Sequence, residues 1–201
     1  MTEQLLSAKK ILEPNIFIME VIMLKSNNPK IIIERTNFFS GEVNFESIQA
    51  LQQNILSYLQ GKESLEQITL IINSTGGTVV DGFAFYDFIK FFKIKLITIG
   101  LGCIQSMGLI LFLCGQYRII GKHAEINLHP IILPKVDGGN INQTKKIIES
   151  SQLSQDDYIN AILEHSNKRL SKNKLNDLIN KEARVSVEDA IRFGWVHEII
   201  E

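Results

Sequence analysis

Hydrophobic residues recur with two different periods along the chain, and this alternation predicts strands separated by helices. Short runs rich in β-branched residues are typical of strands, whereas apolar residues three and four positions apart are typical of helices. We expect strands at 31–34, 68–72, 96–100, 117–120, 126–129 and 196–200. We expect helices at 43–59, 81–92, 107–114, 172–181 and 186–193. Strands that alternate with helices favour parallel pairing, so the pattern predicts an α/β fold.

The segment 142–165 has a different pattern, with scattered apolar residues among many charged ones. A long amphipathic helix, which could be broken or bent and could project from the core, suits its apolar residues Ile147, Ile148, Leu153, Tyr158, Ile162 and Leu163. No Pro-rich or Ser-rich linker and no repeat of fixed period divides the chain. We therefore expect a single domain over residues 1–201.

The two longest apolar runs do not predict a membrane span. The run 16–24 is interrupted by Glu20 and is shorter than the roughly 20 residues that a bilayer requires, so we expect a strand there. The run 96–113 contains polar residues and glycines, which suit a strand, a turn and a buried helix. No basic segment leads into an uninterrupted apolar stretch with a cleavage site, so secretion is not indicated.

The charge balance and the cysteines exclude further classes of partner and compartment. The formal net charge of -1 shows no excess of Lys and Arg that would attract nucleic acid or an anionic membrane. Cys103 and Cys114 lie in apolar sequence without neighbouring metal-ligating residues, so we expect buried free thiols. Free thiols fit a reducing compartment and favour a cytoplasmic protein.

Three segments of unusual composition each follow a predicted strand. They are Asn-Ser-Thr-Gly-Gly-Thr at 73–78, Gly-Cys-Ile-Gln-Ser-Met-Gly at 102–108 and Glu-Ile-Asn-Leu-His at 125–129. Ligands of open α/β sheets usually bind beyond the carboxyl ends of the strands. The three segments are therefore expected to converge on one site.

Ser106 and His129 have the clearest chemistry in these segments. Ser106 lies where a strand should turn into an apolar helix, which exposes a hydroxyl and directs backbone N–H groups toward it. A serine hydroxyl becomes nucleophilic when a neighbouring imidazole takes its proton, and His129 could do so. The backbone N–H groups of Gly77 and Met107 could bind an oxyanion. Together these residues indicate acyl transfer.

Each feature also has a simpler interpretation by itself. Ser106 could be a helix N-cap, His129 an ordinary surface or core histidine, and the pair Gly76 and Gly77 a turn. Their combination in three strand-end segments favours the catalytic interpretation.

The same residues resemble the proteolytic subunits of ATP-dependent Clp peptidases, from about residue 31 to residue 200. Ile-Asn-Ser-Thr-Gly-Gly at 72–77 is similar to that family's Ile-Asn-Ser-Pro-Gly-Gly, and Gly-Phe-Ala-Phe-Tyr-Asp at 82–87 is similar to its Gly-x-Ala-Ile-Tyr-Asp. Ser-Met-Gly at 106–108 resembles the nucleophile segment, and Ala-Glu-Ile-Asn-Leu-His at 124–129 resembles the strand that carries the catalytic histidine.

The resemblance implies a serine endopeptidase with Ser106 as nucleophile, His129 as general base, and Gly77 and Met107 as oxyanion donors. It implies the crotonase-like ββα spiral within one domain, with a divergent N-terminal segment at 1–30 and a projecting handle at about 131–166. The handle would pair two heptameric rings of identical subunits into a tetradecamer, which a Clp ATPase unfoldase would supply with unfolded protein. This chemistry requires no metal and no organic cofactor.

The clearest departure from the family concerns the catalytic acid, which is usually an aspartate. Counting back from Ser186 places Glu182 at that position, and a glutamate can orient the imidazole in some hydrolase triads. Asp177 is a weaker candidate, and Asp189 better suits the start of its helix. Residues 130–139 also differ from the family's Gly-rich entry to the handle.

These departures leave two alternatives to an active peptidase. One is a noncatalytic Clp-like subunit that serves as a scaffold in a mixed ring. The other is an acyl-CoA enzyme of the crotonase superfamily, which shares the spiral fold and the backbone oxyanion hole. The pair of Ser106 and His129 argues against both, because neither alternative requires it.

Overall fold

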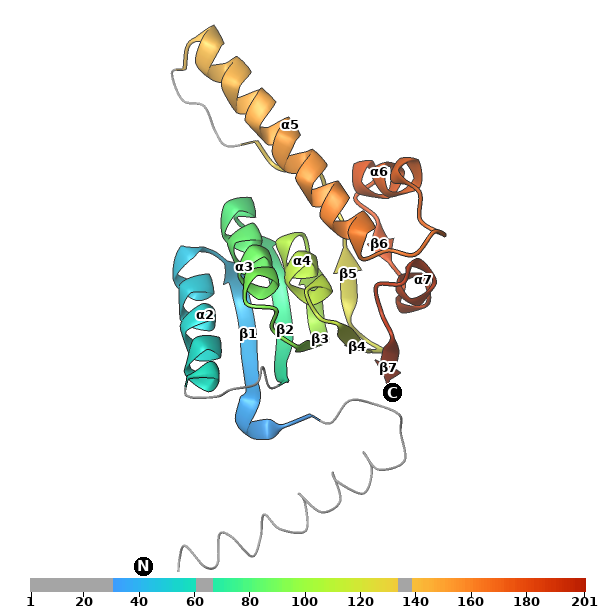
Figure 1. Cartoon of the computed structure of the whole chain (residues 1–201). Coiled ribbons are helices and arrows are strands. Elements are labelled where there is room, and N and C mark those ends of the chain that lie inside the picture. Colours follow the sequence, from blue (N-terminus) through green and yellow to red (C-terminus); the bar gives the residue numbers. More distant parts are fainter. Residues whose placement is uncertain (1–30, 61–66, 134–138) are drawn as a thin grey trace, which may run out of the picture. The chain divides into compact units, whose positions relative to one another are not determined.

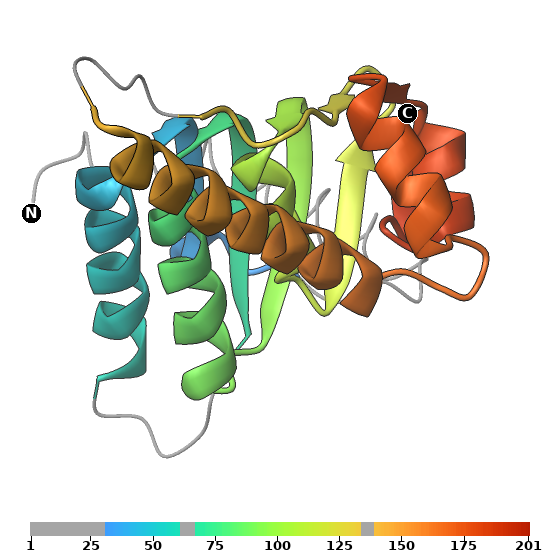
Figure 2. The same cartoon turned by 90° about the horizontal axis from the view of Figure 1, so that it is seen from above.

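A mostly parallel sheet lies at the centre of the fold, and α2, α3 and α4 cover one of its faces (Figures 1 and 2). The computed structural model describes residues 31–60, 67–133 and 139–201, and the residues from Ile32 onward form one compact unit. The strands are β1 (Thr36–Val43), β2 (Ile68–Gly77), β3 (Leu96–Gln105), β4 (Tyr117–Gly121), β5 (Glu125–Asn127), β6 (Arg184–Val185) and β7 (Glu198–Ile200). The helices are η1 (Ile33–Arg35), α2 (Phe45–Leu59), α3 (Val79–Phe91), α4 (Met107–Leu113), α5 (Ile141–Glu164), α6 (Lys172–Asn180) and α7 (Val187–Phe193).

The strand order confirms the α/β fold. The main path runs β1-β2-β3-β4-β7 with parallel neighbours throughout. The second half of β3 leaves β4 and pairs with β5, which in turn pairs with β6 in antiparallel orientation. The sheet is therefore mixed, and it branches at β3.

The helices agree closely with the sequence pattern, but the first strand does not. The strand predicted at 31–34 is wrong, because residues 33–35 form the short helix η1. Pairing begins later, at Thr36 opposite Thr69, and this register directs Phe39 and Val43 into the core. The two-residue strand β6 was not predicted. The strand predicted at 16–24 lies outside the described residues.

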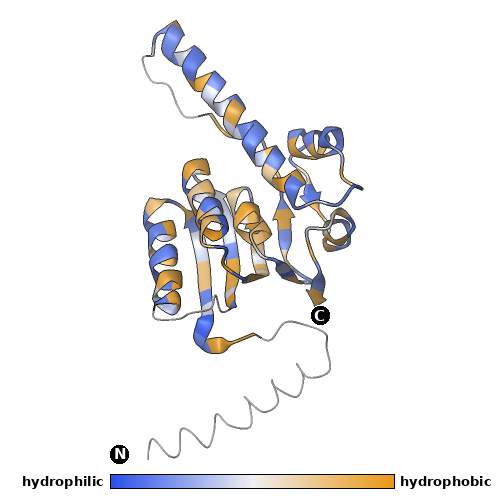
Figure 3. Ribbon diagram, in the orientation of Figure 1, coloured by the Kyte–Doolittle hydropathy of each residue, from blue (hydrophilic) through white to orange (hydrophobic). Residues whose placement is uncertain are grey.

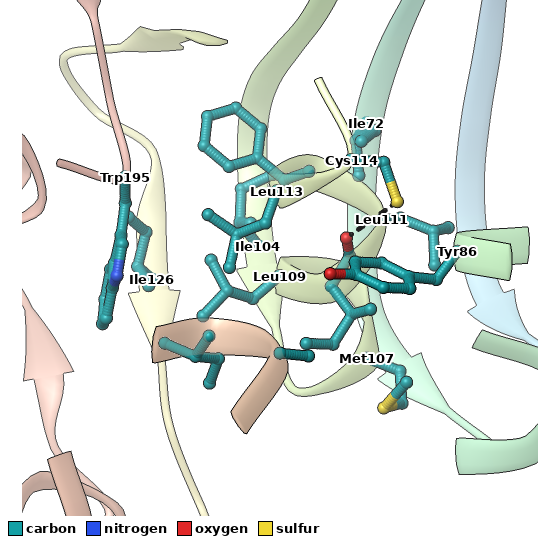
Figure 4. Packing of buried hydrophobic residues seen from close by; sticks show 14 of the residues in the cluster. Ile72, Tyr86, Ile104, Met107, Leu109, Leu111, Leu113, Cys114, Ile126 and Trp195 are labelled. Atoms are coloured by element: carbon teal, nitrogen blue, oxygen red, sulfur yellow. Dashed lines mark hydrogen bonds between the residues drawn. The ribbon is translucent and has the colours of Figure 1, made fainter. Parts of the chain in front are cut away.

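The helix α4 forms the centre of the hydrophobic core. All of its residues are buried, which explains why its sequence is apolar on every side rather than amphipathic. Figure 4 shows its leucines in a cluster with residues of several strands, among them Ile72, Ile104 and Ile126. Since α4 begins directly after Ser106, this packing fixes the position of that serine.

The strands β1, β2 and β3 all bend at one level of the sheet. The register shifts between Ser40 and Glu42 in β1, and again between Ile72 and Ser74 in β2. In β3 the bend contains Gly102, whose φ of +72° suits glycine. The backbone N–H of Cys103, the next residue, donates a hydrogen bond of 2.9 Å to the side chain of Asn73. The bends carry the carboxyl ends of the three strands to one side of the molecule.

A buried arginine holds the C-terminal segment against this sheet. The Arg118 guanidinium donates hydrogen bonds of 2.7 Å to the backbone carbonyls of Gly115, Gly194 and Trp195. Burial lowers the pKa of Arg118 to about 10, so the side chain is still charged at neutral pH. The cation thus neutralises the carbonyl ends of α4 and α7, where partial negative charge accumulates.

The helix α5 packs against the rest of the fold through its C-terminal half. It begins at a capping box in which Asn140 and Gln143 exchange side-chain to backbone hydrogen bonds. Its buried residues are Tyr158, Ile159, Ala161 and Ile162. The first part extends away from the sheet as an unbroken helix with mainly hydrophilic residues (Figures 1 and 3), although Ile141 and Leu153 are 76% and 68% exposed.

The two cysteines differ in their burial. Cys114 is a buried free thiol, but Cys103 is only half-buried, because it lies at the edge where β3 meets the short strand β5. No helix in the described part of the chain combines the length and the apolar character that crossing a membrane requires.

Four polar side chains join α3 to the end of α5. The Tyr86 hydroxyl donates to Glu164 at 2.7 Å, and it lies 3.0 Å from Nε2 of His165. Lys90 pairs with Glu164 at 2.7 Å and lies 4.3 Å from the centre of the Tyr86 ring. Burial, followed by the charge of Arg118, lowers the pKa of His165 to about 4.

The low pKa of His165 predicts a loss of stability in acid. The unfolded chain binds a proton at this position near pH 6.5, whereas the folded chain does so only near pH 4, so stability is full above about pH 6.5 and falls as the pH drops toward about 4. We expect His165→Gln to flatten this dependence. The midpoints of urea unfolding at about pH 7 and pH 5 test this prediction. The control is His123→Gln, a change at an exposed histidine. Equal pH dependence in wild type and His165→Gln would contradict the assignment.

Candidate active site

The bends bring the three strand-end segments to one hollow of about 670 Å³. Its lining includes Gly76 and Gly77 from β2, Ser106 from the start of α4, and His129 from the chain after β5. The predicted convergence of these segments is therefore observed. Among the described residues no hydrogen bond joins Ser106 to His129, and catalytic hydrogen bonds are often long in proteins without bound substrate.

Ser106 has a backbone conformation that is unusual for a residue with a side chain. Its φ and ψ are 49° and -125°, in the sharp turn between β3 and α4. Such conformations cost roughly 1–3 kcal/mol and persist only where the surroundings enforce them. Ser106 occupies the N-cap position of α4, but its side chain makes no capping hydrogen bond. The simpler interpretation as a helix cap therefore does not account for this serine.

The backbone at Gly76 lies directly against Ser106. A Cβ atom at Gly76 would be 2.6 Å from Cβ of Ser106 and 3.0 Å from the backbone nitrogen of Met107. A Cβ atom at Gly77 would be 2.1 Å from the carbonyl oxygen of Val43. Both glycines also have positive φ, 91° and 153°. No residue with a side chain fits either position without displacing its neighbours.

This contact brings the backbone of two candidate oxyanion donors, Gly77 and Met107, close to Ser106. Met107 is the first residue of α4, and an N–H at this position has no partner within the helix. Gly77 lines the hollow beside Ser106. The arrangement could bind a negative oxygen that forms next to the serine hydroxyl.

His129 is oriented by the main chain. Its Nδ1 lies 2.7 Å from the carbonyl oxygen of Pro130. A carbonyl oxygen can only accept a hydrogen bond, so Nδ1 carries the proton in this contact. The neutral ring then has its lone pair on Nε2, which is the form that a general base requires.

Glu182 lies in the turn between α6 and β6, where its φ is +50°, and it is near His129. The β5–β6 pairing sets Asn127 opposite Arg184, and the backbone N–H of Leu128 donates to the carbonyl of Ala183. The next residue of each segment is His129 or Glu182, and both line a second hollow of about 400 Å³. Among the described residues, however, no hydrogen bond joins Glu182 to His129, so its role as the acid stays a prediction.

The other two carboxylates considered have different partners. Asp177 forms an ion pair of 2.8 Å with Lys181, and the hydrogen bond from that lysine lowers the pKa of Asp177. The backbone N–H of Asp189 donates to the N-cap Ser186, and its carboxylate pairs with Arg192. Asp189 thus serves the start of α7, as the sequence indicates.

Several residues of the hollow have no local sequence signal. Val79, Val80, Ile131 and Ile132 form apolar parts of its wall, and Ser151 of α5 also reaches it. These residues come from α3, from the chain after His129, and from a helix that begins far along the sequence. Only the tertiary fold brings them together, and an amphipathic pattern alone does not identify Ser151.

The fit around Gly76 yields a stability prediction. Gly76→Ala should destabilise the protein by about 1–3 kcal/mol more than Gly41→Ala, because the new methyl group overlaps Ser106. Gly41 is a matched control, since its φ is also positive, +112°, but a Cβ atom there meets nothing within 4 Å. Urea unfolding of both variants gives the difference. Equal losses would show that the cost comes from backbone conformation alone.

Comparison with known proteins identifies the family of this chain. Residues 24–201 match the family model described as Clp protease. A relative from a Synechococcus strain, the ATP-dependent Clp protease proteolytic subunit 3, is 30% identical over 174 residues, which cover 84% of this chain and 83% of the relative. The ATP-dependent Clp protease proteolytic subunit 2 from Prochlorococcus marinus is also 30% identical over 174 residues, with the same coverage. The chain therefore belongs to the Clp protease family, whose members are serine peptidases.

Proposed function

We propose that this chain is an active serine endopeptidase that hydrolyses peptide bonds of unfolded proteins or peptides. The observation that carries the proposal is the packing of Gly76 against Ser106 and Met107, in a hollow that also contains His129. The proposed nucleophile Ser106, the proposed base His129 and the candidate donor Gly77 all line this hollow, which supports the proposal. Membership of the Clp protease family favours peptide substrates over acyl-CoA.

The proposed reaction proceeds in two stages. Oγ of Ser106 attacks the peptide carbonyl carbon while Nε2 of His129 takes the hydroxyl proton. The N–H groups of Gly77 and Met107 bind the oxyanion, and losing one such donor typically costs roughly 3–4 kcal/mol of transition-state stabilisation. His129 then gives its proton to the leaving amine as the C–N bond breaks. Water, deprotonated by the same imidazole, releases the acyl group and restores the serine.

Glu182 completes the proposed site as the carboxylate near His129. A negative charge at this position favours the imidazolium that forms in the transition state. Nδ1 already has an acceptor in the Pro130 carbonyl. We therefore assign Glu182 an electrostatic contribution, smaller than that of an acid that alone fixes the ring.

The proposal includes assembly of identical subunits into rings and delivery of substrate by a Clp ATPase. Two observations support it. The relatives are named as proteolytic subunits of ATP-dependent proteases. The extended part of α5 also exposes Ile141, Ile148 and Leu153, which single subunits would leave in water.

Cleavage of short fluorogenic peptides tests the nucleophile. On material whose oligomeric state is checked by light scattering, Ser106→Ala should reduce kcat/KM to background, a loss of more than about a thousandfold. The exposed Ser57→Ala on α2 should behave as wild type. A well-formed wild-type oligomer that cleaves no peptide and reacts with no serine-directed probe would instead support the scaffold alternative.

The role of Glu182 has a separate test. Glu182→Gln should lower kcat by less than about 100-fold, because the main chain still holds Nδ1, whereas triads that depend on the carboxylate lose about ten-thousandfold. Glu188→Gln, an exposed glutamate on the neighbouring helix, is the control. A loss of kcat near ten-thousandfold for Glu182→Gln would show that its carboxylate replaces the Pro130 carbonyl as the hydrogen-bond acceptor of Nδ1 during turnover.

A further inference from the structure

One face of α5 contacts both of the segments that carry the proposed catalytic pair. Ser151, Gln155 and Tyr158 are four and then three positions apart, so they lie on the same side of the helix. Ser151 lines the hollow beside Ser106 and His129. Gln155 and Tyr158 form hydrogen bonds to the backbone on either side of it.

We propose that Gln155 is a positioning residue that orients His129 through the peptide group between Pro130 and Ile131. This inference rests on the proposed function and deepens it. It assigns a role to a side chain on the helix that the sequence identified only as the handle.

The argument begins with the two ends of one peptide group. Its N–H, from Ile131, donates to Oε1 of Gln155 at 2.7 Å. Its carbonyl oxygen, from Pro130, accepts from Nδ1 of His129 at 2.7 Å. A peptide group is planar and rigid, so fixing its N–H direction also fixes the direction of its carbonyl. Gln155 therefore determines where the acceptor for His129 points.

The chain around this peptide offers few other restraints. Pro130 has no N–H to donate, and Ile132 and Leu133 are exposed. The segment leaves the β5–β6 ladder after Leu128, whose N–H makes the last of its backbone hydrogen bonds. The bond to Gln155 therefore secures the chain where the sheet no longer does so.

The direction of the Gln155 amide follows from its partner. A backbone N–H can only donate, so the amide must present its oxygen. Any side chain with an acceptor oxygen at the same reach can replace it, whereas alanine cannot. This distinction provides a conservative variant that should restore the function.

Tyr158, on the same face of α5, contacts the backbone of the proposed nucleophile. Its buried hydroxyl lies 3.4 Å from the carbonyl oxygen of Ser106, a long contact that we treat as secondary. Gln155 and Tyr158 project from the same rigid helix. The helix α5 therefore contacts both the backbone after His129 and the backbone of Ser106.

Peptidase kinetics test the proposal directly. Gln155→Ala should lower kcat by about 10- to 100-fold, the typical effect of small misplacement, with little change in KM. Gln155→Glu keeps an acceptor oxygen and should stay within about threefold of wild type. Gln152→Ala, an exposed glutamine on the same helix, is the matched control. Light scattering on every variant separates loss of assembly from loss of orientation.

A second readout does not depend on turnover. In protein with isotope-labelled histidine, NMR reports which ring nitrogen of His129 carries the proton, with His129→Gln for assignment. Wild type and Gln155→Glu should show the proton on Nδ1, and Gln155→Ala should shift it toward Nε2. Unchanged kcat and unchanged tautomer in Gln155→Ala would overturn the inference. A wild type that cleaves no peptide would overturn the proposed function, while the tautomer comparison would still decide the role of Gln155.

Discussion

The close approach of the Gly76–Gly77 backbone to its neighbours is the constraint on which the site depends. One glycine lies against Ser106, and the other lies against the carbonyl of Val43 at the end of β1. At both positions a methyl group would occupy space already filled by other atoms. The backbones at Val43, at Gly76–Gly77 and at Ser106 are thus in direct contact although they are distant in sequence. The hollow beside them keeps its shape because glycine has no side chain that would push these backbones apart.

This contact requires the strands to bend together and the core to be rigid below it. The bends at Gly41, Asn73 and Gly102 lie at one level, so β1, β2 and β3 turn toward the same side. Beneath Ser106, the fully buried α4 leaves the turn no room to relax. The unusual φ of Ser106 is maintained by this packing, in agreement with the general rule that backbone strain survives only where its surroundings enforce it.

Much of the fold and of the candidate site could be predicted from the sequence, because the signals are local. The glycine pair, the apolar run after Ser106 and the alternation of strands and helices each leave a trace within a few residues. Other features depend on register. The strand predicted at 31–34 failed because pairing with β2 begins at Thr36, and a pattern of apolar residues does not record which partner residue lies opposite. The strand β6 consists of only two residues, and Gln155 looks like any polar residue of an amphipathic helix until the fold brings it to Ile131.

The hydrogen bond from His129 to the Pro130 carbonyl also has an evolutionary consequence. A main-chain oxygen is present whatever codon occupies its position, so this means of holding the ring survives mutations that would remove a carboxylate. A carboxylate beside the histidine is correspondingly less necessary for holding the ring. The orientation of the imidazole therefore depends on the course of the main chain through Pro130 rather than on one carboxylate side chain.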